Sequence, residues 1–189
     1  MNYPDIIFIE PRALNDEGCE KIIDIWDSIE YQELLSPEHG EGDWQIEVED
    51  DTVSYRYQHS GKDMATLRDP HVDQVLSIMG DMIPNHPDFG PIHYMQIVRY
   101  NEGSFFPFHT DAADSTDTAT TMLLLNDNYH GGELMIEPGV RVTPQKGSVI
   151  SFNNSTKILH GVEPIYKGER FVLLIWYGSK EETNEQTQV

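Results

Sequence analysis

Cysteine is nearly missing from this sequence, since Cys19 is the only one. A single thiol cannot form an intrachain disulfide, and it cannot supply a set of cysteine ligands to zinc. A disulfide-stabilised domain and a cysteine-based zinc site are therefore excluded, and we expect a cytoplasmic location.

Long apolar runs are missing as well. No run approaches the ~18 residues that a helix needs to cross a bilayer. The first ten residues include Asp5 and Glu10 and no basic residue, so they do not resemble a secretory signal. We therefore expect neither a membrane span nor a signal peptide.

Basic residues are scarce: 12 lysines and arginines oppose 33 acidic residues, which gives a formal charge of −21. Residues 1–60 hold 16 of the acids, against Arg12, Lys21 and Arg56. Such a surface repels nucleic acid phosphates and anionic lipids. This disfavours an enzyme that acts on DNA or RNA; the charge serves solubility or attracts a basic partner.

The 189 residues, of which 38% are hydrophobic, suffice for one globular domain with a sizeable core. Periodicity and capping residues predict helices in the first half. The predicted elements are a strand at 4–9, a helix from Asn15 or Asp16 to about Glu33, a loop with short strands over 36–63, and a helix at about 69–81.

The second half changes character at Ile92, where short β-prone runs begin to alternate with turn dipeptides such as Gly131–Gly132. The predicted strands are approximately 92–100, 104–111, 118–126, 132–137, 140–143, 148–152, 158–163 and 170–178. Strands with such short links indicate an antiparallel sandwich or jelly roll, followed by a polar tail at 179–189.

A candidate metal site begins with His109-Thr110-Asp111. Residues two apart on a strand point to the same face, so His109 and Asp111 can reach one ion together. A second histidine from a distant strand would complete two imidazoles and one carboxylate, a set that leaves positions of iron(II) open. His160 is the best candidate because it lies within an apolar late strand.

Arg170 stands at the head of the apolar strand Phe171–Trp176. Burying a charge there is unfavourable unless an anion meets it, and a guanidinium can hold a carboxylate in a bidentate fork. The simpler interpretation is a surface residue in a hairpin turn. The neighbouring histidine motif favours the anion site.

Other short motifs accompany these residues. In order they are Gln96–Gly103, Phe108–Asp111, Leu124–Asn126, Gly131–Leu134, Pro144–Gly147, Leu159–Gly161 and Lys167–Arg170. With this order and spacing, residues 96–178 resemble the catalytic core of the prolyl 4-hydroxylase-like branch of the 2-oxoglutarate/iron(II) dioxygenases. The resemblance implies a mainly β fold, a double-stranded β-helix (jelly roll, cupin-like) with supporting N-terminal helices.

The resemblance also implies a role for each matching residue. His109, Asp111 and His160 would be the iron ligands, and Arg170 would bind the distal carboxylate of 2-oxoglutarate. Tyr100 matches a tyrosine that supports the cosubstrate carboxylate. Leu124 replaces a tyrosine of the family, so one expected hydrogen bond is missing. Because Asp111 is a carboxylate, the halogenase variant of this fold is disfavoured.

The activity implied by the resemblance is hydroxylation of an aliphatic C–H by oxygen and 2-oxoglutarate at Fe(II), with release of succinate and carbon dioxide. A peptidyl side chain such as proline is the leading substrate, and ascorbate is a further candidate cofactor. Residues 92–178 would be the catalytic core, and residues 1–91 a support with a candidate substrate lid. Tyr55–Tyr57 in that segment and Trp176 are candidate substrate contacts.

Three alternatives remain open. The same fold and ligands also serve hydroxylases of free amino acids or small metabolites. A non-catalytic cupin-like binding module would keep the barrel without the redox chemistry. A zinc hydrolase would use the same three ligands with Glu133 or Glu163 as general acid or base.

Overall fold

The chain is built mainly from antiparallel strands. The computed structural model describes residues 6–32, 50–59, 61–80, 89–111, 118–137, 139–143, 145–154 and 158–178. In chain order the elements are β1 (Ile6–Glu10), α1 (Asp16–Ser28), β2 (Tyr55–His59), β3 (Lys62–Thr66), α2 (His71–Met79), β4 (Ile92–Tyr100), β5 (Phe106–His109), β6 (Ala119–Leu124), β7 (His130–Gly131), β8 (Leu134–Ile136), β9 (Val140–Val142), β10 (Val149–Asn153), β11 (His160–Val162), β12 (Ile165–Lys167) and β13 (Arg170–Tyr177).

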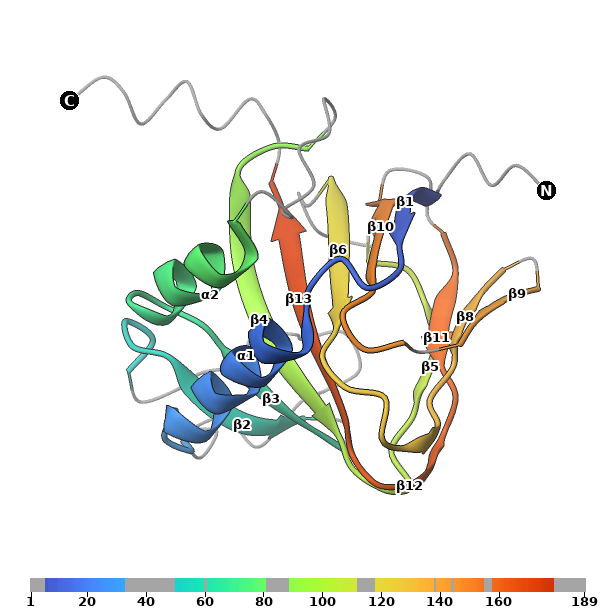
Figure 1. Cartoon of the computed structure of the whole chain (residues 1–189), viewed down its shortest axis with the longest axis horizontal. Coiled ribbons are helices and arrows are strands. Elements are labelled where there is room, and N and C mark those ends of the chain that lie inside the picture. Colours follow the sequence, from blue (N-terminus) through green and yellow to red (C-terminus); the bar gives the residue numbers. More distant parts are fainter. Residues whose placement is uncertain are drawn as a thin grey trace, which may run out of the picture.

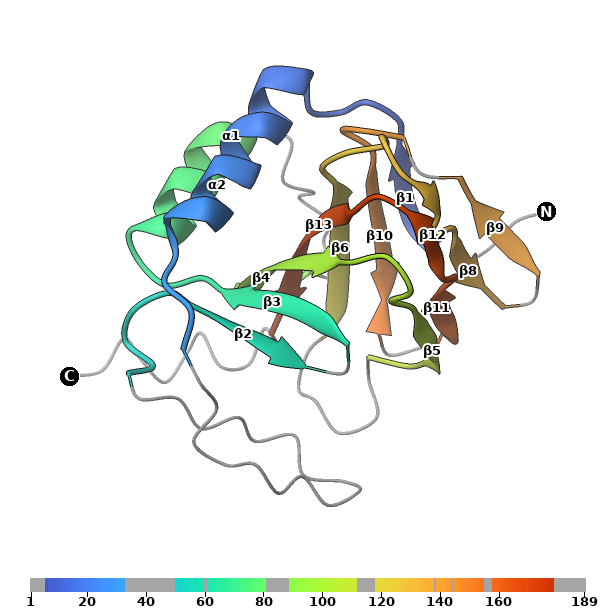
Figure 2. The same cartoon turned by 90° about the horizontal axis from the view of Figure 1, so that it is seen from below.

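Two sheets face each other. The larger has the order β1-β10-β6-β13-β4-β3-β2, the smaller has the order β5-β11-β8-β9, and β12 pairs with β7. Helices α1 and α2 cover the outer face of the larger sheet, and the smaller sheet lies across its inner face (Figure 1). The hairpin β2–β3 extends the larger sheet on the side away from β1 (Figure 2). The predicted jelly roll with supporting N-terminal helices is confirmed.

The alternation along β13 divides the interior into two cores. Leu173 and Ile175 point outward into the cluster that contains α1 and α2, whereas Val172 points inward into the cluster between the sheets. Period-two alternation gives each strand residue one of the two faces. Residues of β13 with even numbers, Arg170 included, therefore share the inner face.

Helix α1 begins as predicted and ends earlier than predicted. The side chain of Asn15 accepts a hydrogen bond from the Gly18 amide at 2.8 Å, which caps the first turn. The predicted continuation to about Glu33 is wrong, because the chain leaves the helix after Ser28. Gln32 donates to the Arg56 carbonyl at 2.8 Å, so pairing with β2 replaces the last helical turn.

Strand β3 is longer than the sequence predicted. The expected loop with short strands ended at residue 63, but β3 continues to Thr66 and pairs with β4 over Asp63–Thr66. This pairing is supported by Arg99, which donates to Asp63 at 2.6 Å across the two strands. Strand β12 was also not predicted as a separate element. Residues 33–49 and 179–189 lie outside the described residues.

The helices are short. Neither α1 nor α2, the helices within the described ranges, is long and apolar enough to cross a membrane.

Candidate metal centre

Three candidate ligands meet between the two sheets. Strands β5 and β11 pair so that His160 lies opposite His109, and Asp111 follows His109 by two residues. The Nε2 atoms of His109 and His160 lie 3.3 Å and 3.5 Å from Oδ1 of Asp111. One ligand atom from each residue lies within 4.8 Å of the others, a spacing that fits one metal ion.

Both imidazoles are held in the same way. Nδ1 of His109 contacts the Pro107 carbonyl at 3.0 Å, and Nδ1 of His160 contacts the Ile158 carbonyl at 3.2 Å. A carbonyl oxygen only accepts, so each Nδ1 carries a proton, and in the neutral form of each ring Nε2 is the nitrogen that can bind a metal. The tautomer that binds a metal through Nε2 is therefore already selected.

Glycine allows the two ligand strands to approach closely. A Cβ at Gly161, next to His160, would lie 2.9 Å from the Phe106 carbonyl oxygen of β5. Any larger residue would push β5 and β11 apart. The Leu159–Gly161 motif thus supplies the candidate ligand His160, and its glycine leaves the room that β11 needs to pair with β5.

Asp111 is oriented by a buried polar pair. The Thr120 hydroxyl on β6 donates to Oδ2 of Asp111 at 2.7 Å, and the Asn154 amide lies 3.0 Å from the same hydroxyl. A hydroxyl has one proton, so the Asn154 amide must donate to Thr120 while Thr120 donates to Asp111. This chain leaves Oδ1 of Asp111 facing the two histidines.

The protonation states favour metal binding. Burial by itself would raise the pKa of Asp111, but the His109 ring, the nearby His160 and the Thr120 hydroxyl together lower this pKa below its usual value. Burial lowers the pKa of His160, and the charge of Asp111 only partly opposes that effect. At neutral pH the carboxylate is ionised and His160 is neutral, as metal ligation requires.

Arg170 is a buried cation on the inner face of the larger sheet. Its side chain is 0% exposed, and its Nε and Nη1 have no hydrogen-bond partner in the part of the chain that the structure describes. Its Nη2 lies 3.6 Å from the sulfur of Met122, and its Cζ lies 5.0 Å from the ring centre of Tyr100. These weak contacts do not compensate for the lost hydration of a guanidinium, so the geometry fits an anionic ligand.

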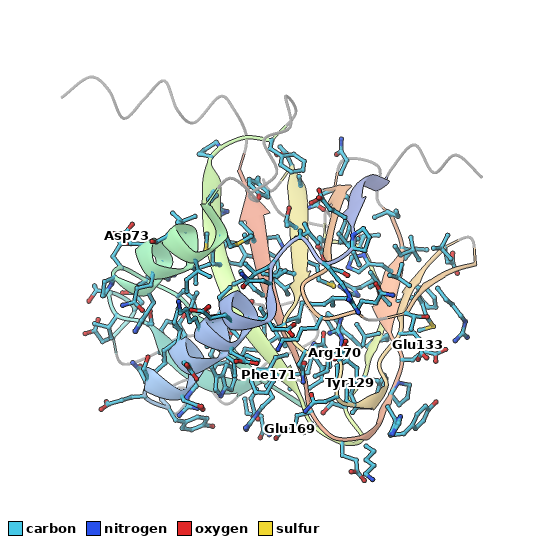
Figure 3. All side chains as sticks on the ribbon, in the orientation of Figure 1. Asp73, Tyr129, Glu133, Glu169, Arg170 and Phe171 are labelled. Atoms are coloured by element: carbon cyan, nitrogen blue, oxygen red, sulfur yellow. The ribbon has the colours of Figure 1, made fainter. Side chains whose placement is uncertain are left out.

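The surroundings fix Arg170 in place. Asn126 accepts a hydrogen bond from the Phe171 amide at 2.7 Å and donates to the Glu169 carbonyl at 2.8 Å, on either side of Arg170. Phe171 points toward α1, where its ring lies 5.8 Å from that of Trp26, while Arg170 points to the side of Tyr129 (Figure 3). The Leu124–Asn126 motif therefore holds both neighbours of the cation.

Two hydroxyls lie near the guanidinium. Burial raises the pKa values of Tyr100 and Tyr129, and the charge of Arg170 opposes this effect in both, as does the closeness of its N–H groups to the two hydroxyls. The Tyr129 hydroxyl has no hydrogen-bond partner among the described residues. A Cβ at Gly132, whose φ is +70°, would lie 3.1 Å from Tyr129 and 3.2 Å from Cδ of Arg170. Leu124 is buried in the same cluster as Tyr100 and offers no hydroxyl.

The other candidate residues have different surroundings. Glu163 forms an ion pair with Arg141, and neither Glu133 nor Glu163 belongs to the metal-ligand cluster found among the described residues. Trp176 stacks on Tyr94 at 4.4 Å between ring centres, on the same face of β13 as Arg170.

The candidate contacts on β2 divide between two faces. Tyr57 is hydrogen-bonded to Gln96 on the inner face of the larger sheet. Arg56 instead lies over the Trp26 ring of α1, 5.3 Å from its centre, so it points away from the metal cluster.

Several residues of the site were not found from the sequence. Thr120, Asn154, Tyr129 and Lys62 are polar residues that the fold buries near the predicted ligands. Strand alternation places Thr120 on the same face as Met122 and Leu124, and this was the only sequence signal. Which face points inward depends on the pairing of the strands.

Comparison with known proteins agrees with these features. Residues 95–178 match the family model of the 2OG-Fe(II) oxygenase superfamily. A PKHD-type hydroxylase of Alteromonas mediterranea is 34% identical over 61% of this chain and 59% of its own length. Prolyl 4-hydroxylase 13 of Arabidopsis thaliana is 25% identical over 90% of this chain and 70% of its own length. The chain spans 43–61% of the length of three PKHD-type relatives.

Solved structures show the same fold. The viral collagen prolyl hydroxylase of Paramecium Bursaria Chlorella virus-1 superposes with a TM-score of 0.63 at 16% identity, over 91% of this chain and 94% of that chain. The prolyl hydroxylase of Trichoplax adhaerens, in complex with a hypoxia inducible factor peptide fragment, has a TM-score of 0.61 at 17% identity, over 96% and 87% of the chains. The predicted resemblance to prolyl hydroxylase-like dioxygenases is confirmed.

Replacing Arg170 by methionine is expected to raise the free energy of unfolding of the ligand-free protein by about 1 kcal/mol, because it removes a buried charge that pairs with no carboxylate among the described residues. Arg99→Met is the matched control. Arg99 donates to Asp63 at 3.1 Å and 2.6 Å, so its loss should lower the free energy of unfolding by about 1 kcal/mol. Urea unfolding at neutral pH measures both, and equal destabilisation of the two variants would show that Arg170 is not an unpaired cation.

Proposed function

We propose that this chain, whose residues 95–178 match the family model of the 2OG-Fe(II) oxygenase superfamily, hydroxylates an aliphatic C–H with Fe(II), oxygen and 2-oxoglutarate. His109, Asp111 and His160 are the proposed iron ligands, and Arg170 is the proposed anchor of the cosubstrate. Two observations carry the proposal: the cluster of two imidazoles and one carboxylate, and the fully buried guanidinium of Arg170, which pairs with no carboxylate among the described residues.

The three ligands fit Fe(II). Two neutral imidazoles and one carboxylate form the facial set typical of non-haem iron(II) oxygenases, with the remaining positions open. Bound iron with 2-oxoglutarate and oxygen supplies the oxidising power for the reaction and leaves succinate and carbon dioxide. The task of this chain is to hold the ligands rigidly. The Nδ1 contacts and the Thr120 hydroxyl do so before any metal arrives.

The cation pocket fits a dicarboxylate cosubstrate. In this proposal Arg170 pairs with the distal carboxylate of 2-oxoglutarate, and Tyr100 contacts the same ligand through its hydroxyl. Nη1 of Arg170 has no hydrogen-bond partner among the described residues, and together with Nη2 it forms an edge that can donate two parallel hydrogen bonds to one carboxylate. Water is excluded because Leu124, Met122 and Val172 line the same core, so the pairing takes place at low dielectric.

A peptidyl side chain, with proline as the first choice, is the proposed substrate. Its support is the likeness to proteins named as prolyl hydroxylases, together with the stacked rings of Tyr94 and Trp176 on the inner face. The excess of acidic residues favours a basic peptide over nucleic acid. Hydroxylation of a free amino acid is the second candidate, since the ligand set alone does not distinguish the two.

The division of labour along the chain is also a proposal. Residues 92–178 would be the catalytic core, and α1 with α2 would support the larger sheet from outside. The proposed substrate lid is the segment 36–63, of which residues 36–49 and 60 lie outside the described residues, while Tyr55–His59 form β2. Ascorbate would keep the iron reduced, and the cytoplasm is the proposed location.

The test of this function is succinate formation with Fe(II), ascorbate and a panel of proline peptides and free amino acids. The wild-type protein should convert 2-oxoglutarate to succinate, and His160→Ala and Asp111→Ala should reduce the rate at least about a hundredfold because each removes a metal ligand. Metal analysis of the same samples should show the loss of bound iron. Full activity in either variant would refute the ligand assignment, and no 2-oxoglutarate turnover with bound metal would support a non-catalytic binding module.

Thr120→Val should lower metal affinity by about tenfold, because Asp111 loses the hydrogen bond that orients it. Thr121→Val is a matched control: Thr121 is the next residue, is also buried, and bonds Ser151 instead of Asp111. Competition with a chromogenic chelator measures both affinities. Equal affinities for the two variants would show that Thr120 does not orient the metal ligand.

The metal-free protein should lose stability as the pH falls below about 6.5, the ordinary pKa of histidine. Burial lowers the pKa of His160 in the folded state, so below this pH the unfolded chain takes up the proton more readily than the folded chain. The loss is complete once the pH is below the lowered pKa. Urea unfolding between about pH 7.5 and pH 5 measures it. His160→Gln should weaken the dependence, and an unchanged dependence in that variant would assign it to another group.

A further inference from the structure

Lys62 is a second buried cation, and the proposed function does not yet use it. It lies at the start of β3 and is 3% exposed. No carboxylate among the described residues forms an ion pair with it, and burial lowers its pKa to about 8. Lysine is almost never buried to this degree without a partner, so the position points to a ligand.

The ammonium group of Lys62 reaches across to the smaller sheet. Its Nζ lies 3.0 Å from the ring centre of Phe106 on β5 and 5.7 Å from that of Tyr100 on β4. The two aromatic faces stabilise the charge in part. The Phe106 ring in turn lies 4.1 Å from the ring of His109, so Lys62 is one side chain away from the metal cluster.

Lys62 and Arg170 lie on either side of one tyrosine. On one side of β4, Tyr100 lies opposite Arg170 of β13. On the other side, β3 runs antiparallel to β4 with Asp63 opposite Arg99. The preceding residue of β3, Lys62, therefore lies beside the following residue of β4, Tyr100. The Tyr100 ring centre lies 5.0 Å from Cζ of Arg170 and 5.7 Å from Nζ of Lys62. Three adjacent strands thus present cation, phenol and cation on the inner face, and Leu124 on the fourth strand offers no donor.

We propose that Lys62 is a second cationic contact for the distal carboxylate of 2-oxoglutarate, placed across Tyr100 from Arg170. This inference rests on the proposed function and names a binding residue that the ligand set alone does not reveal. A carboxylate between a guanidinium and an ammonium receives donors from both sides. One anion then compensates for both buried charges, which explains why neither cation has a carboxylate partner within the described chain.

The test compares two keto acids that differ only at the distal end. 2-Oxoglutarate and 2-oxopentanoate share the keto acid head, but only the former carries the distal carboxylate. Anaerobic calorimetry on the Fe(II)-loaded protein gives the dissociation constants without turnover. Lys62→Met should raise the dissociation constant of 2-oxoglutarate by about tenfold to a hundredfold and that of 2-oxopentanoate by less than about twofold.

Two controls separate binding from folding. Met64→Leu changes the next inward residue of the same strand without a change of charge, and it should leave both dissociation constants within about twofold. Without ligand, Lys62→Met should melt at the same or a higher temperature than the wild type, because it removes a desolvated charge. If Lys62→Met does not fold, the two dissociation constants are compared in Lys62→Gln, which removes the charge but keeps a polar group at the end of the side chain.

The outcomes are distinct. Equal losses for both keto acids would overturn the proposal, because Lys62 would then act at the keto acid head. Unchanged 2-oxoglutarate affinity, with a raised KM for a substrate that carries a carboxylate, would also overturn it and assign Lys62 to the substrate. If the wild-type protein binds neither keto acid, the proposed function itself fails, whatever the variant does.

Discussion

The buried charge of Arg170 is the constraint on which the rest of the structure depends. A guanidinium taken out of water loses several kcal/mol of hydration unless hydrogen bonds and an opposite charge replace it. Here the ring of Tyr100 and the sulfur of Met122 supply only weak contacts. The fold nevertheless holds the cation rigidly, because Asn126 bonds the backbone on both sides of it. Such a group is stable only because the rest of the core is well packed, and its natural complement is an anion.

The metal cluster differs from Arg170, since each of its three ligand side chains is already held by a hydrogen bond before a metal binds. Each histidine is held by a carbonyl two residues earlier, and Asp111 accepts a hydrogen bond from Thr120, which accepts one from Asn154. This arrangement lowers the reorganisation needed for binding and leaves one lone pair per ligand directed to a common point. The two halves of the site therefore differ in what they can bind. The two histidines and Asp111 form a preformed ligand set for a metal cation, and the guanidinium of Arg170 can bind an anion.

Parts of this site follow from local pattern. His109 and Asp111 share a face because strand residues alternate, and Arg170 stands out because it heads an apolar strand. Both predictions concern neighbours in sequence, where backbone geometry decides the direction of a side chain. The end of α1 was wrong for the converse reason. The stretch after Ser28 remains compatible with a helix, but Gln32 pairs with Arg56 of a distant strand, and this pairing decides its conformation.

The sequence by itself determined the strand alternation, the two-residue step from His109 to Asp111, the capped start of α1 and the order of the motifs, since each depends on residues close together in the chain. Only the tertiary structure decided that His160 lies opposite His109, that Thr120 supports Asp111, and that Lys62 is buried beside Tyr100. These contacts join segments that are not neighbours in sequence. They depend on the register and order of strand pairing, which are set by the joint burial of many side chains. The sequence of any single segment therefore does not predict them.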